Sequence, residues 1–431
     1  MFFRETDSFT NMRSLLGALA ESMNLINPDV SHHHEQTAYL AYLIATDMQL
    51  PRSEVNLTVY AALLHDVGSV VQGRQKSVSE IQRDAKAVSM AGAVMCYGLQ
   101  GFERIGDVIA YCQFSQDEMK VVLEMANEKG QTDQLSVIRV ASIIHLADKV
   151  SLMIRPYEPV LIQSKRIREA ISRLRNVEFD SETVDSFLRI VELEYVWMDM
   201  MHHPNCFLDY MGEIEPLTLK SAVHITHLMS RIVDSKSPFT AMHSAGVSAS
   251  ASKLAELAGM SDRECQMMAI AGYLHDLGKL VVPKHILEKP GKLTDDEFGI
   301  IKEHPYYTRM ILSQIDGFEQ IANWAGNHHE KLNGRGYPYH LHASELDLGS
   351  RMMSVADIFS AITEVRPYRA GMKKDMAIKV MKENVEFGAI DHYLVQLLLD
   401  HYEEVDTVRD TISREEGVHY FQSLTRENEI P

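Results

Sequence analysis

The chain is poor in cysteine and in basic residues. It has four cysteines, at 96, 112, 206 and 265, and 42 Lys and Arg against 60 Asp and Glu, for a formal net charge of −18. Sparse cysteines without paired metal-type spacing exclude a disulfide framework and are typical of buried thiols in a reducing cytosol. The acidic balance disfavours binding of long nucleic acid, which needs a broad basic surface. A small anionic ligand remains compatible with it if cations are concentrated at one site.

Long apolar runs are also absent. No stretch approaches the roughly 18 apolar residues that a membrane span requires, and the segment from Met1 to Asp7 lacks the pattern of a signal peptide. We therefore expect a soluble, cytoplasmic protein with no membrane partner.

Helical patterning dominates the sequence. Apolar residues make up 45% of the chain and recur at intervals of three and four, whereas alternating runs rich in Val, Ile and Thr are scarce. The 24 methionines follow the same spacing, as expected of residues that fill a core. An all-α fold is predicted, with enough residues for two or three domains.

Four sequence blocks occur twice in the same order, at a nearly constant offset. The paired blocks are 60–68 with 270–278, 147–148 with 356–357, 155–157 with 366–368, and 176–179 with 384–387. The repeat is far longer than solenoid periods, so it predicts two related helical domains in tandem. We place them at 1–200 and 226–431, with a linker region at 201–225 where prolines interrupt helix.

The second copy gathers histidines and aspartates that are candidate metal ligands. They are His243, His275, Asp276, His304, His328, His329 and Asp357. Imidazoles and carboxylates together suit first-row ions such as iron, manganese or zinc. A histidine in isolation is more often a core or surface residue, but five of them with two aspartates in this arrangement favour a metal site.

Local sequence predicts where these ligands lie on helices. Gly278 follows His275 and Asp276 closely, so the pair should occupy the last turn of a helix. Pro305 places His304 near the start of the next helix.

The adjacent His328 and His329 would point about 100° apart on a helix. They could then serve neighbouring ions, or an ion and the substrate, but not easily one tetrahedral structural site. Two ions are therefore expected.

Three ordered motifs resemble the signatures of the HD-GYP family. They are His275-Asp276, the run from His328 to Pro338, and Val355-Ala356-Asp357, within a similarity that extends over roughly 225–420. That family is an all-helical branch of the HD phosphohydrolases that acts in bacterial second-messenger signalling. It cleaves cyclic dinucleotides, chiefly cyclic di-GMP and in some members 3′,3′-cyclic GMP-AMP. The resemblance implies a metal-dependent phosphodiesterase that yields a linear 5′-phosphorylated dinucleotide.

The resemblance also implies a role for each ligand. One metal would be held by His243, His275, Asp276 and Asp357, and Asp276 would bridge to a second metal held by His304, His328 and His329. Two cations close together can lower the pKa of a bridging water and neutralise charge on the phosphoryl oxygens. The expected cofactors are two divalent ions, with iron or manganese favoured. Asp276 and Lys279 are the predicted catalytic residues.

Cationic and aromatic residues near the motifs are expected to contact the cyclic dinucleotide. They are Lys279, Arg335, Tyr337, Arg366 and Arg369. Lys279 would meet the phosphate as a point charge, and the glycines of 334–338 permit a tight loop that presents Tyr337. Arg366 and Arg369 could equally be solvated surface charges.

Two positions depart from the family pattern. Phe239 stands where members with a third metal have a glutamate, so two metals are expected. Thr308 stands where the family often has glycine.

The first copy keeps only part of this set. His33, His65, Asp66 and Asp148 occupy the positions of the first metal. The histidine pair is replaced by Cys112-Gln113, Ser69 stands at the position of Lys279, the position of His304 falls near Met90, and the Gly-Tyr-Pro loop is missing. We interpret residues 1–200 as a non-catalytic copy that binds one metal, senses a ligand or simply packs against its sibling, the last being favoured. His32 and His34 are expected to be exposed.

Two other functions stay open at this point. A general HD nucleotidase is disfavoured by the Gly-Tyr-Pro loop, and a non-catalytic signalling module that binds cyclic dinucleotides is disfavoured by the full ligand set. The sequence does not separate cyclic di-GMP from 3′,3′-cyclic GMP-AMP, and it leaves the oligomeric state open, a homodimer included.

Overall fold

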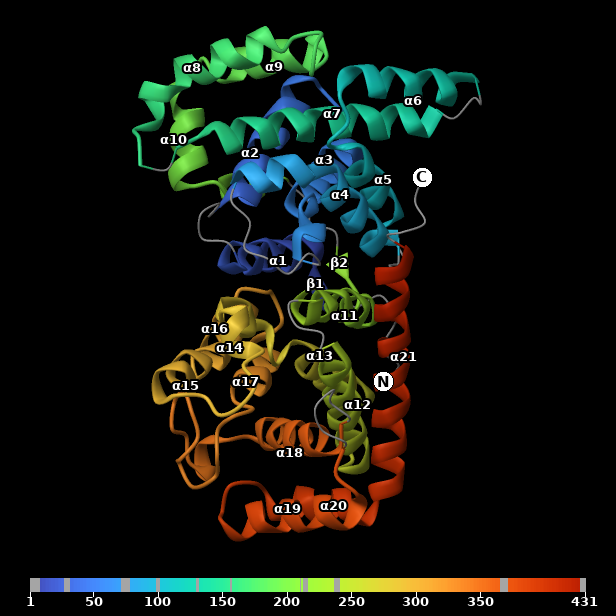
Figure 1. The fold of residues 1–431 in the computed structure, drawn as a ribbon, viewed down its shortest axis with the longest axis vertical. Coiled ribbons are helices and arrows are strands. Elements are labelled where there is room, and N and C mark those ends of the chain that lie inside the picture. The colour runs from blue at the N-terminus through green and yellow to red at the C-terminus, as the bar shows by residue number, and fades with distance from the viewer. Residues whose placement is uncertain are drawn as a thin grey trace. The chain divides into compact units, whose positions relative to one another are not determined.

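The computed structural model describes residues 8–26, 32–70, 78–97, 101–128, 132–155, 157–209, 211, 216–235, 241–364 and 371–426. Two compact units emerge, one formed by 19–215 and the other by 1–18 together with 216–431 (Figure 1). Both consist of helices, so the predicted all-α fold is confirmed. Among the described residues, no helix has the length and apolar character needed to cross a membrane.

The N-terminal unit is built from helices of the first copy. They are α1 (Met12–Ile26, which begins in the other unit), α2 (His33–Asp47), α3 (Arg52–Leu64), η2 (Val67–Val70), α4 (Val78–Tyr97), α5 (Glu103–Tyr111), α6 (Gln116–Glu128), α7 (Thr132–Met153), α8 (Val160–Arg173), α9 (Ser181–Ile190), α10 (Glu194–His202) and η3 (Cys206–Asp209). Helix α2 packs against α3 and α7, and its residues from His33 to Ala41 are all buried. Helices α8 to α10 pack beside this group.

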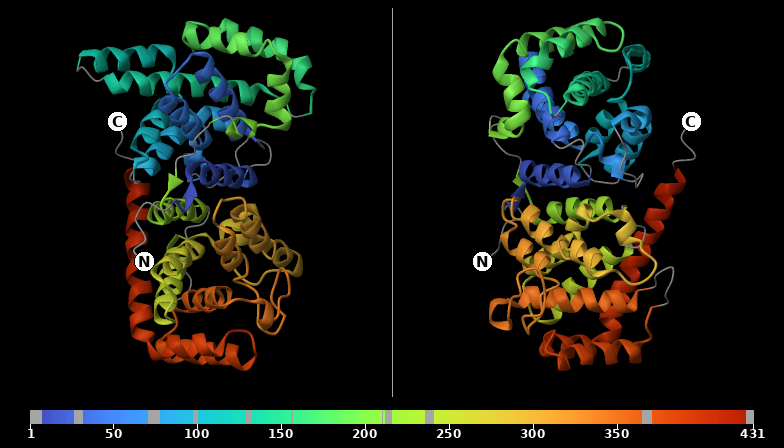
Figure 2. Two further views of the ribbon diagram at one scale, coloured as in Figure 1. Left: turned by 180° about the vertical axis from the view of Figure 1, so that it is seen from behind. Right: turned by 60° about the vertical axis from the view of Figure 1, so that its left-hand side comes forward.

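The C-terminal unit repeats the pattern. Its elements are β1 (Thr10–Asn11), β2 (Pro216–Leu217), α11 (Leu219–Ser235), α12 (Ala241–Leu257), α13 (Asp262–Leu274), η4 (Leu277–Val281), α14 (Lys284–Leu287), α15 (Asp295–Ile301), α16 (His304–Leu312), α17 (Glu319–Gly326), η5 (Ala343–Glu345), α18 (Leu348–Thr363), α19 (Lys374–Glu386), α20 (His392–Asp400) and α21 (Tyr402–Arg426). Helix α12 packs against α13, α18 and the long α21, which lies beside it in Figure 1 and in the left view of Figure 2.

A short antiparallel pair ties the start of the chain to the C-terminal unit. Thr10 pairs with Leu217, and the side chain of Asn11 donates a hydrogen bond of 2.6 Å to Asp316. The aromatic ring of Phe9 packs on Phe318 at 5.7 Å. Residues 1–18 therefore belong to the C-terminal unit, and the N-terminal unit begins at residue 19 instead of residue 1.

In each unit, a glycine after the His-Asp pair lets its backbone pack directly against the backbone of a later helix. A Cβ on Gly278 would collide with the carbonyl oxygen of His304, and a Cβ on Gly68 would collide with that of Val88. This contact makes Val88 the counterpart of His304, close to the position near Met90 that the sequence indicated.

Cysteine burial differs partly from the expectation. All four cysteines are free, and Cys96 and Cys112 are buried, whereas Cys206 and Cys265 are partly exposed.

Candidate functional site

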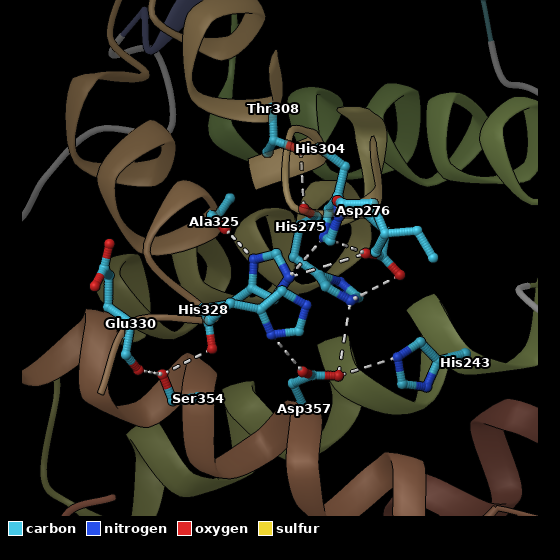
Figure 3. Close-up of polar contacts among 12 residues, drawn as sticks. His243, His275, Asp276, His304, Thr308, Ala325, His328, Glu330, Ser354 and Asp357 are labelled. Atoms are coloured by element: carbon cyan, nitrogen blue, oxygen red, sulfur yellow. Dashed lines mark hydrogen bonds and ion pairs between the residues drawn. The ribbon is translucent and has the colours of Figure 1, made fainter. Parts of the chain in front are cut away.

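The predicted ligands of the second copy converge in the C-terminal unit, although they come from five separate segments (Figure 3). His243 lies on α12, and His275 and Asp276 cap the end of α13 where the chain turns into η4. The remaining ligands are His304 at the start of α16, His328 and His329 after α17, and Asp357 on α18. All of them are buried except His329, whose side chain is 29% exposed.

The two carboxylate oxygens of Asp276 face different histidines. Oδ2 lies 3.2 Å from Nε2 of His275, whereas Oδ1 lies 3.4 Å from Nε2 of His304 and 3.9 Å from Nε2 of His328. One carboxylate thus spans two groups of ligand atoms, as a residue that bridges two cations must.

Asp357 also contacts both groups. Its Oδ1 lies 3.2 Å from Nε2 of His243 and 4.0 Å from Nε2 of His275, and its Oδ2 lies 3.8 Å from Nδ1 of His329. Each aspartate therefore lies between the histidine groups.

Backbone carbonyl groups set the tautomers of three imidazoles. Nδ1 donates to the carbonyl oxygen three residues earlier, at 2.7 Å in His275, 2.6 Å in His304 and 2.6 Å in His328. A carbonyl oxygen only accepts, so Nδ1 carries the proton and Nε2 of the neutral ring presents a lone pair. A hydrogen bond from one ring nitrogen to a backbone carbonyl orients a histidine so that its other nitrogen can bind a metal.

The converging atoms fit divalent cations. His243, His275 and Asp276 form one group of candidate ligand atoms, and His304, His328 and His329 form another. Nε2 of His275 and Oδ1 of Asp276 are buried and make no hydrogen bond within the described part of the chain. Buried groups of this polarity are costly unless they are paired, and a bound cation would satisfy them.

The charge states of His304, His328 and Asp276 at neutral pH agree with this fit. Burial lowers the pKa of His304 to about 3 and that of His328 to about 4, so both rings are neutral and able to ligate. Burial alone would raise the pKa of Asp276, but His275 and Lys279 outweigh it and hold the pKa well below its usual value. The carboxylate is therefore ionised.

His328 and His329 do not lie on a helix, which corrects the prediction. Helix α17 ends at Gly326, and both histidines follow in a turn. Their ring centroids are 4.0 Å apart, so the two side chains lie close together instead of diverging. The glycine at the helix end was the signal in the sequence that indicated this.

Two of the predicted substrate residues, Lys279 and Tyr337, lie beside the ligand groups. Nζ of Lys279 is 2.5 Å from Oδ2 of Asp276, and the ring of Tyr337 packs on that of His329 at 4.8 Å. The side chain of Arg335 is exposed. Arg366, Arg369 and Phe239 lie outside the described residues.

Sequence reasoning missed two buried glutamates. Oε2 of Glu364 lies 3.4 Å from Nδ1 of His243, on the side of the ring opposite Asp357. The carboxylate of Glu330 accepts hydrogen bonds from the backbone of Tyr339 at 2.6 Å and Leu341 at 3.0 Å, which fixes the loop. Glu364 follows a helix with no motif around it, so no sequence signal identifies it.

Thr308, the departure from the family's glycine, supports the ligands. Its hydroxyl donates to the carbonyl oxygen of His275 at 3.0 Å and accepts from the backbone of Gly278 at 2.9 Å. The threonine thus fixes the turn that carries His275 and Asp276.

The first copy forms a smaller cluster of the same kind. Nε2 of His33 lies 3.2 Å from both Nε2 of His65 and Oδ1 of Asp148, and Nε2 of His65 lies 3.5 Å from Oδ2 of Asp66. Nδ1 of His65 is bonded to the carbonyl oxygen of Ala62 at 2.7 Å, as at His275. His33, His65 and Asp66 form a group that could hold an ion.

In the first copy, the residues that correspond to His304, His328 and His329 carry no imidazole. Val88 replaces His304, and Cys112 and Gln113 replace the histidine pair. The amide of Gln113 donates to Oδ2 of Asp148 at 2.7 Å, and the Cys112 thiol contacts the hydroxyl of Ser89 at 3.4 Å. These side chains occupy the place where a second ion would need ligands.

His34 is buried, contrary to the expectation, whereas His32 is exposed as expected. The ring of His34 packs 5.4 Å from that of His65, and burial lowers its pKa well below the usual value. All residues of the first turn of α2 are buried, so adjacent side chains that point in different directions are both shielded from solvent.

Each of the two copies matches a known domain family. Residues 227–394 and residues 30–153 each match an HD domain family. The chain is 29% identical over 406 residues to 3′3′-cGAMP-specific phosphodiesterase 1 of Vibrio cholerae, covering 90% of this chain and 91% of that protein. It is 40% identical to 3′3′-cGAMP-specific phosphodiesterase 3 of the same organism over 188 residues, which are 42% and 41% of the two chains.

Two further similarities extend the comparison. A cyclic di-GMP phosphodiesterase of Pseudomonas aeruginosa is 37% identical over 177 residues, 41% of this chain and 42% of that protein. A crystal structure of a cyclic GMP-AMP-specific phosphodiesterase of V. cholerae has a TM-score of 0.60 at 23% identity, covering 91% of this chain and 98% of that one. The structural similarity concerns the fold alone.

Paired histidines and aspartates on helical HD domains define a member of the HD phosphohydrolases. Within that class, the chain belongs to the HD-GYP family of cyclic dinucleotide phosphodiesterases, with the motifs at His275-Asp276 and Gly336-Tyr337-Pro338.

Proposed function

We propose that the C-terminal unit hydrolyses cyclic di-GMP or 3′,3′-cyclic GMP-AMP to a linear 5′-phosphorylated dinucleotide, with two divalent cations bound. The position of Asp276 is the observation that carries this proposal, because its two oxygens face separate histidine groups. The relatives act on cyclic dinucleotides, as their names state.

Each side chain has a task in this reaction. His243, His275 and Asp357 hold one cation position, and His304, His328 and His329 hold the other. A pair of cations there supplies Lewis acidity and an activated water for attack on phosphorus. Mixed imidazole and carboxylate ligands suit iron or manganese.

Lys279 and the loop orient the substrate. The ammonium of Lys279 lies beside Asp276, where it can neutralise a phosphate oxygen. Tyr337 is held against His329 and closes one side of the site. Arg335, Arg366 and Arg369 complete the proposed substrate contacts.

We assign no catalysis to the N-terminal unit. His33, His65, Asp66 and Asp148 are proposed to hold one ion, and the second group of ligands is replaced. We place the protein in the cytoplasm of a bacterium, since its cysteines are free and its relatives are bacterial.

A chromatographic assay tests the function. The purified chain, loaded with Mn²⁺ or anaerobically with Fe²⁺, is incubated with cyclic di-GMP, 3′,3′-cyclic GMP-AMP and cyclic di-AMP, and the metal content of the same sample is measured. Linear dinucleotide should form from one of the first two, and the Asp276→Ala variant should form none. A metal-loaded protein that cleaves none of the three would overturn the proposal.

A further inference from the structure

Two aromatic rings extend outward from the ligand histidines. The ring of Tyr337 lies 4.8 Å from that of His329, and the rings of Phe298 and Tyr337 meet edge to face, with centroids 6.1 Å apart and an interplanar angle of 83°. Phe298 is 42% exposed. An aromatic surface thus begins at a candidate metal ligand and continues to solvent.

Phe298 does not belong to a packed core. It lies on α15, a helix with no buried residue. That helix is fixed at its start by a capping box between Thr294 and Glu297, and Lys289 pairs with the same glutamate at 2.6 Å. The exposed ring is therefore held in place by polar groups, as expected of a side chain that contacts a ligand.

A lysine lies over both rings. Nζ of Lys302 is 4.8 Å from the centroid of Phe298 and 5.9 Å from that of Tyr337, within the range of cation–π interactions. The next aromatic residue of the loop, Tyr339, has Arg309 over its ring at 4.9 Å. These cations stand out in a chain with a net charge of −18. Lys302 thus places a positive charge beside Tyr337, whose ring packs on the candidate ligand His329.

The chemistry of the substrate requires such a surface. A cyclic dinucleotide has two phosphodiester groups and two purines, and the cation pair can hold only the phosphodiester that is cleaved. The second phosphate needs another cation, and the bases need flat apolar faces. Stacking on aromatic side chains and contact with a nearby cation are how proteins bind exposed bases.

We propose that Phe298, Tyr337 and Lys302 form a subsite for the half of the cyclic dinucleotide that the cations do not hold. One purine stacks on the exposed ring of Phe298 beside Tyr337, and Lys302 neutralises the second phosphate. The subsite rests on the proposed phosphodiesterase function, and it assigns roles to two residues of the segment before His304.

Steady-state kinetics of the metal-loaded full chain test the subsite. Phe298→Ala should raise the KM for the cyclic dinucleotide about 10- to 100-fold, in line with the loss of one stacked base, and change kcat far less. Phe298→Leu keeps an apolar side chain without a ring and should behave in the same way, whereas Phe298→Tyr should restore the KM. The exposed Tyr393, on α20, offers a matched control, and Tyr393→Ala should leave the KM unchanged.

A direct measurement reports stacking itself. In an analogue of cyclic GMP-AMP with 2-aminopurine in place of adenine, fluorescence should be quenched on rapid mixing with the wild type, before turnover. The Phe298→Leu variant should lose most of this quenching. Lys302→Gln should raise the KM and weaken its dependence on salt, and Lys302→Arg should restore both.

The outcomes separate the subsite from the function. A wild-type KM in Phe298→Leu would show that the ring only packs against the loop and would overturn the subsite. Equal loss of activity toward methyl 4-nitrophenyl phosphate, which has no purine, would overturn it as well. A wild type that cleaves this small diester but no cyclic dinucleotide would instead contradict the proposed function.

Discussion

Nε2 of His304 lies 3.3 Å from Nε2 of His328, and both rings use Nδ1 to donate to backbone carbonyls. Two neutral imidazoles in these tautomers direct lone pairs at each other, an unfavourable contact unless an electrophile lies between them. With Oδ1 of Asp276 at 3.4 Å from His304, the arrangement fits a cation position. The hydrogen bonds to the backbone carbonyls also keep both imidazoles oriented toward this cation position in the folded chain.

Replacement of Asp276 by alanine should abolish turnover. The variant loses a carboxylate whose two oxygens face separate histidine groups, so we expect at least about a thousandfold lower kcat and the loss of bound metal from the C-terminal unit. Asp66→Ala, the same change in the first copy, is the matched control and should keep activity. Wild-type rates with full metal content in Asp276→Ala would refute the bridging role.

The two copies should respond differently to loss of their motifs. His65→Ala combined with Asp66→Ala should leave phosphodiesterase activity within about twofold of wild type, because Val88, Cys112 and Gln113 leave no second group of ligands there. His275→Ala should eliminate activity. If the first-copy variant loses activity while its circular dichroism and thermal unfolding stay normal, the N-terminal unit takes part in the reaction.

Metal content should follow the same division. Elemental analysis should find about three ions per wild-type chain, about two in the His65→Ala, Asp66→Ala variant and about one in Asp276→Ala. Phe239 cannot ligate a cation, so a third ion in the C-terminal unit is not expected. Three ions beside Asp276 in anomalous scattering would contradict this count, and Phe239→Glu tests whether a third position can be created.

The cluster of candidate ligands that the structure brings together was predictable from sequence, because its residues lie in short motifs. His275-Asp276 and Asp357 were identified by residue type and spacing alone, and helical periodicity gave the all-α fold. Contacts between distant segments had no such signal. The pairing of Thr10 with Leu217 involves two-residue strands without periodicity, so the join between the chain start and the C-terminal unit emerged only in the structure.

The contact between Glu364 and His243 also had no signal in the sequence. From this contact we predict an effect of Glu364 on metal affinity. Its carboxylate faces Nδ1 of His243 and should orient the ring and strengthen Nε2 as a ligand. Although burial lowers the pKa of His243, Asp357 and Glu364 raise it to about 10. Glu364→Ala should weaken metal binding about 10- to 100-fold in a chelator competition.

Conservative replacement distinguishes orientation from folding at this position. Glu364→Gln keeps the size and a hydrogen-bond acceptor for Nδ1, so most of the affinity should return. In the first copy, the neutral hydroxyl of Ser151 accepts from Nδ1 of His33 at 2.9 Å and offers a comparison without a carboxylate. Unchanged metal affinity in Glu364→Ala would show that the contact has no role.

Glu178 should make the stability of the N-terminal unit depend on pH. Hydrogen bonds from His145 and Lys149 outweigh partial burial and lower the pKa of Glu178 from 4.5 to about 2. Ionised Glu178 therefore stabilises the folded state above pH 4.5, and this stabilisation is lost as the pH falls through about 2. Glu178→Gln should lower the free energy of unfolding by about 1–2 kcal/mol at pH 7, a value reduced for partial exposure to solvent.

Urea unfolding of both proteins between pH 7 and pH 3 measures this difference. The gap between wild type and Glu178→Gln should narrow as the pH falls below 4.5, because protonation removes the charge from the wild type as well. Glu182→Gln, an exposed change on α9, should leave stability within about 0.5 kcal/mol of wild type at every pH. If the difference in unfolding free energy between wild type and Glu178→Gln stays constant across this range, shape and packing, and not the hydrogen bonds from His145 and Lys149 to the ionised carboxylate, give Glu178 its effect.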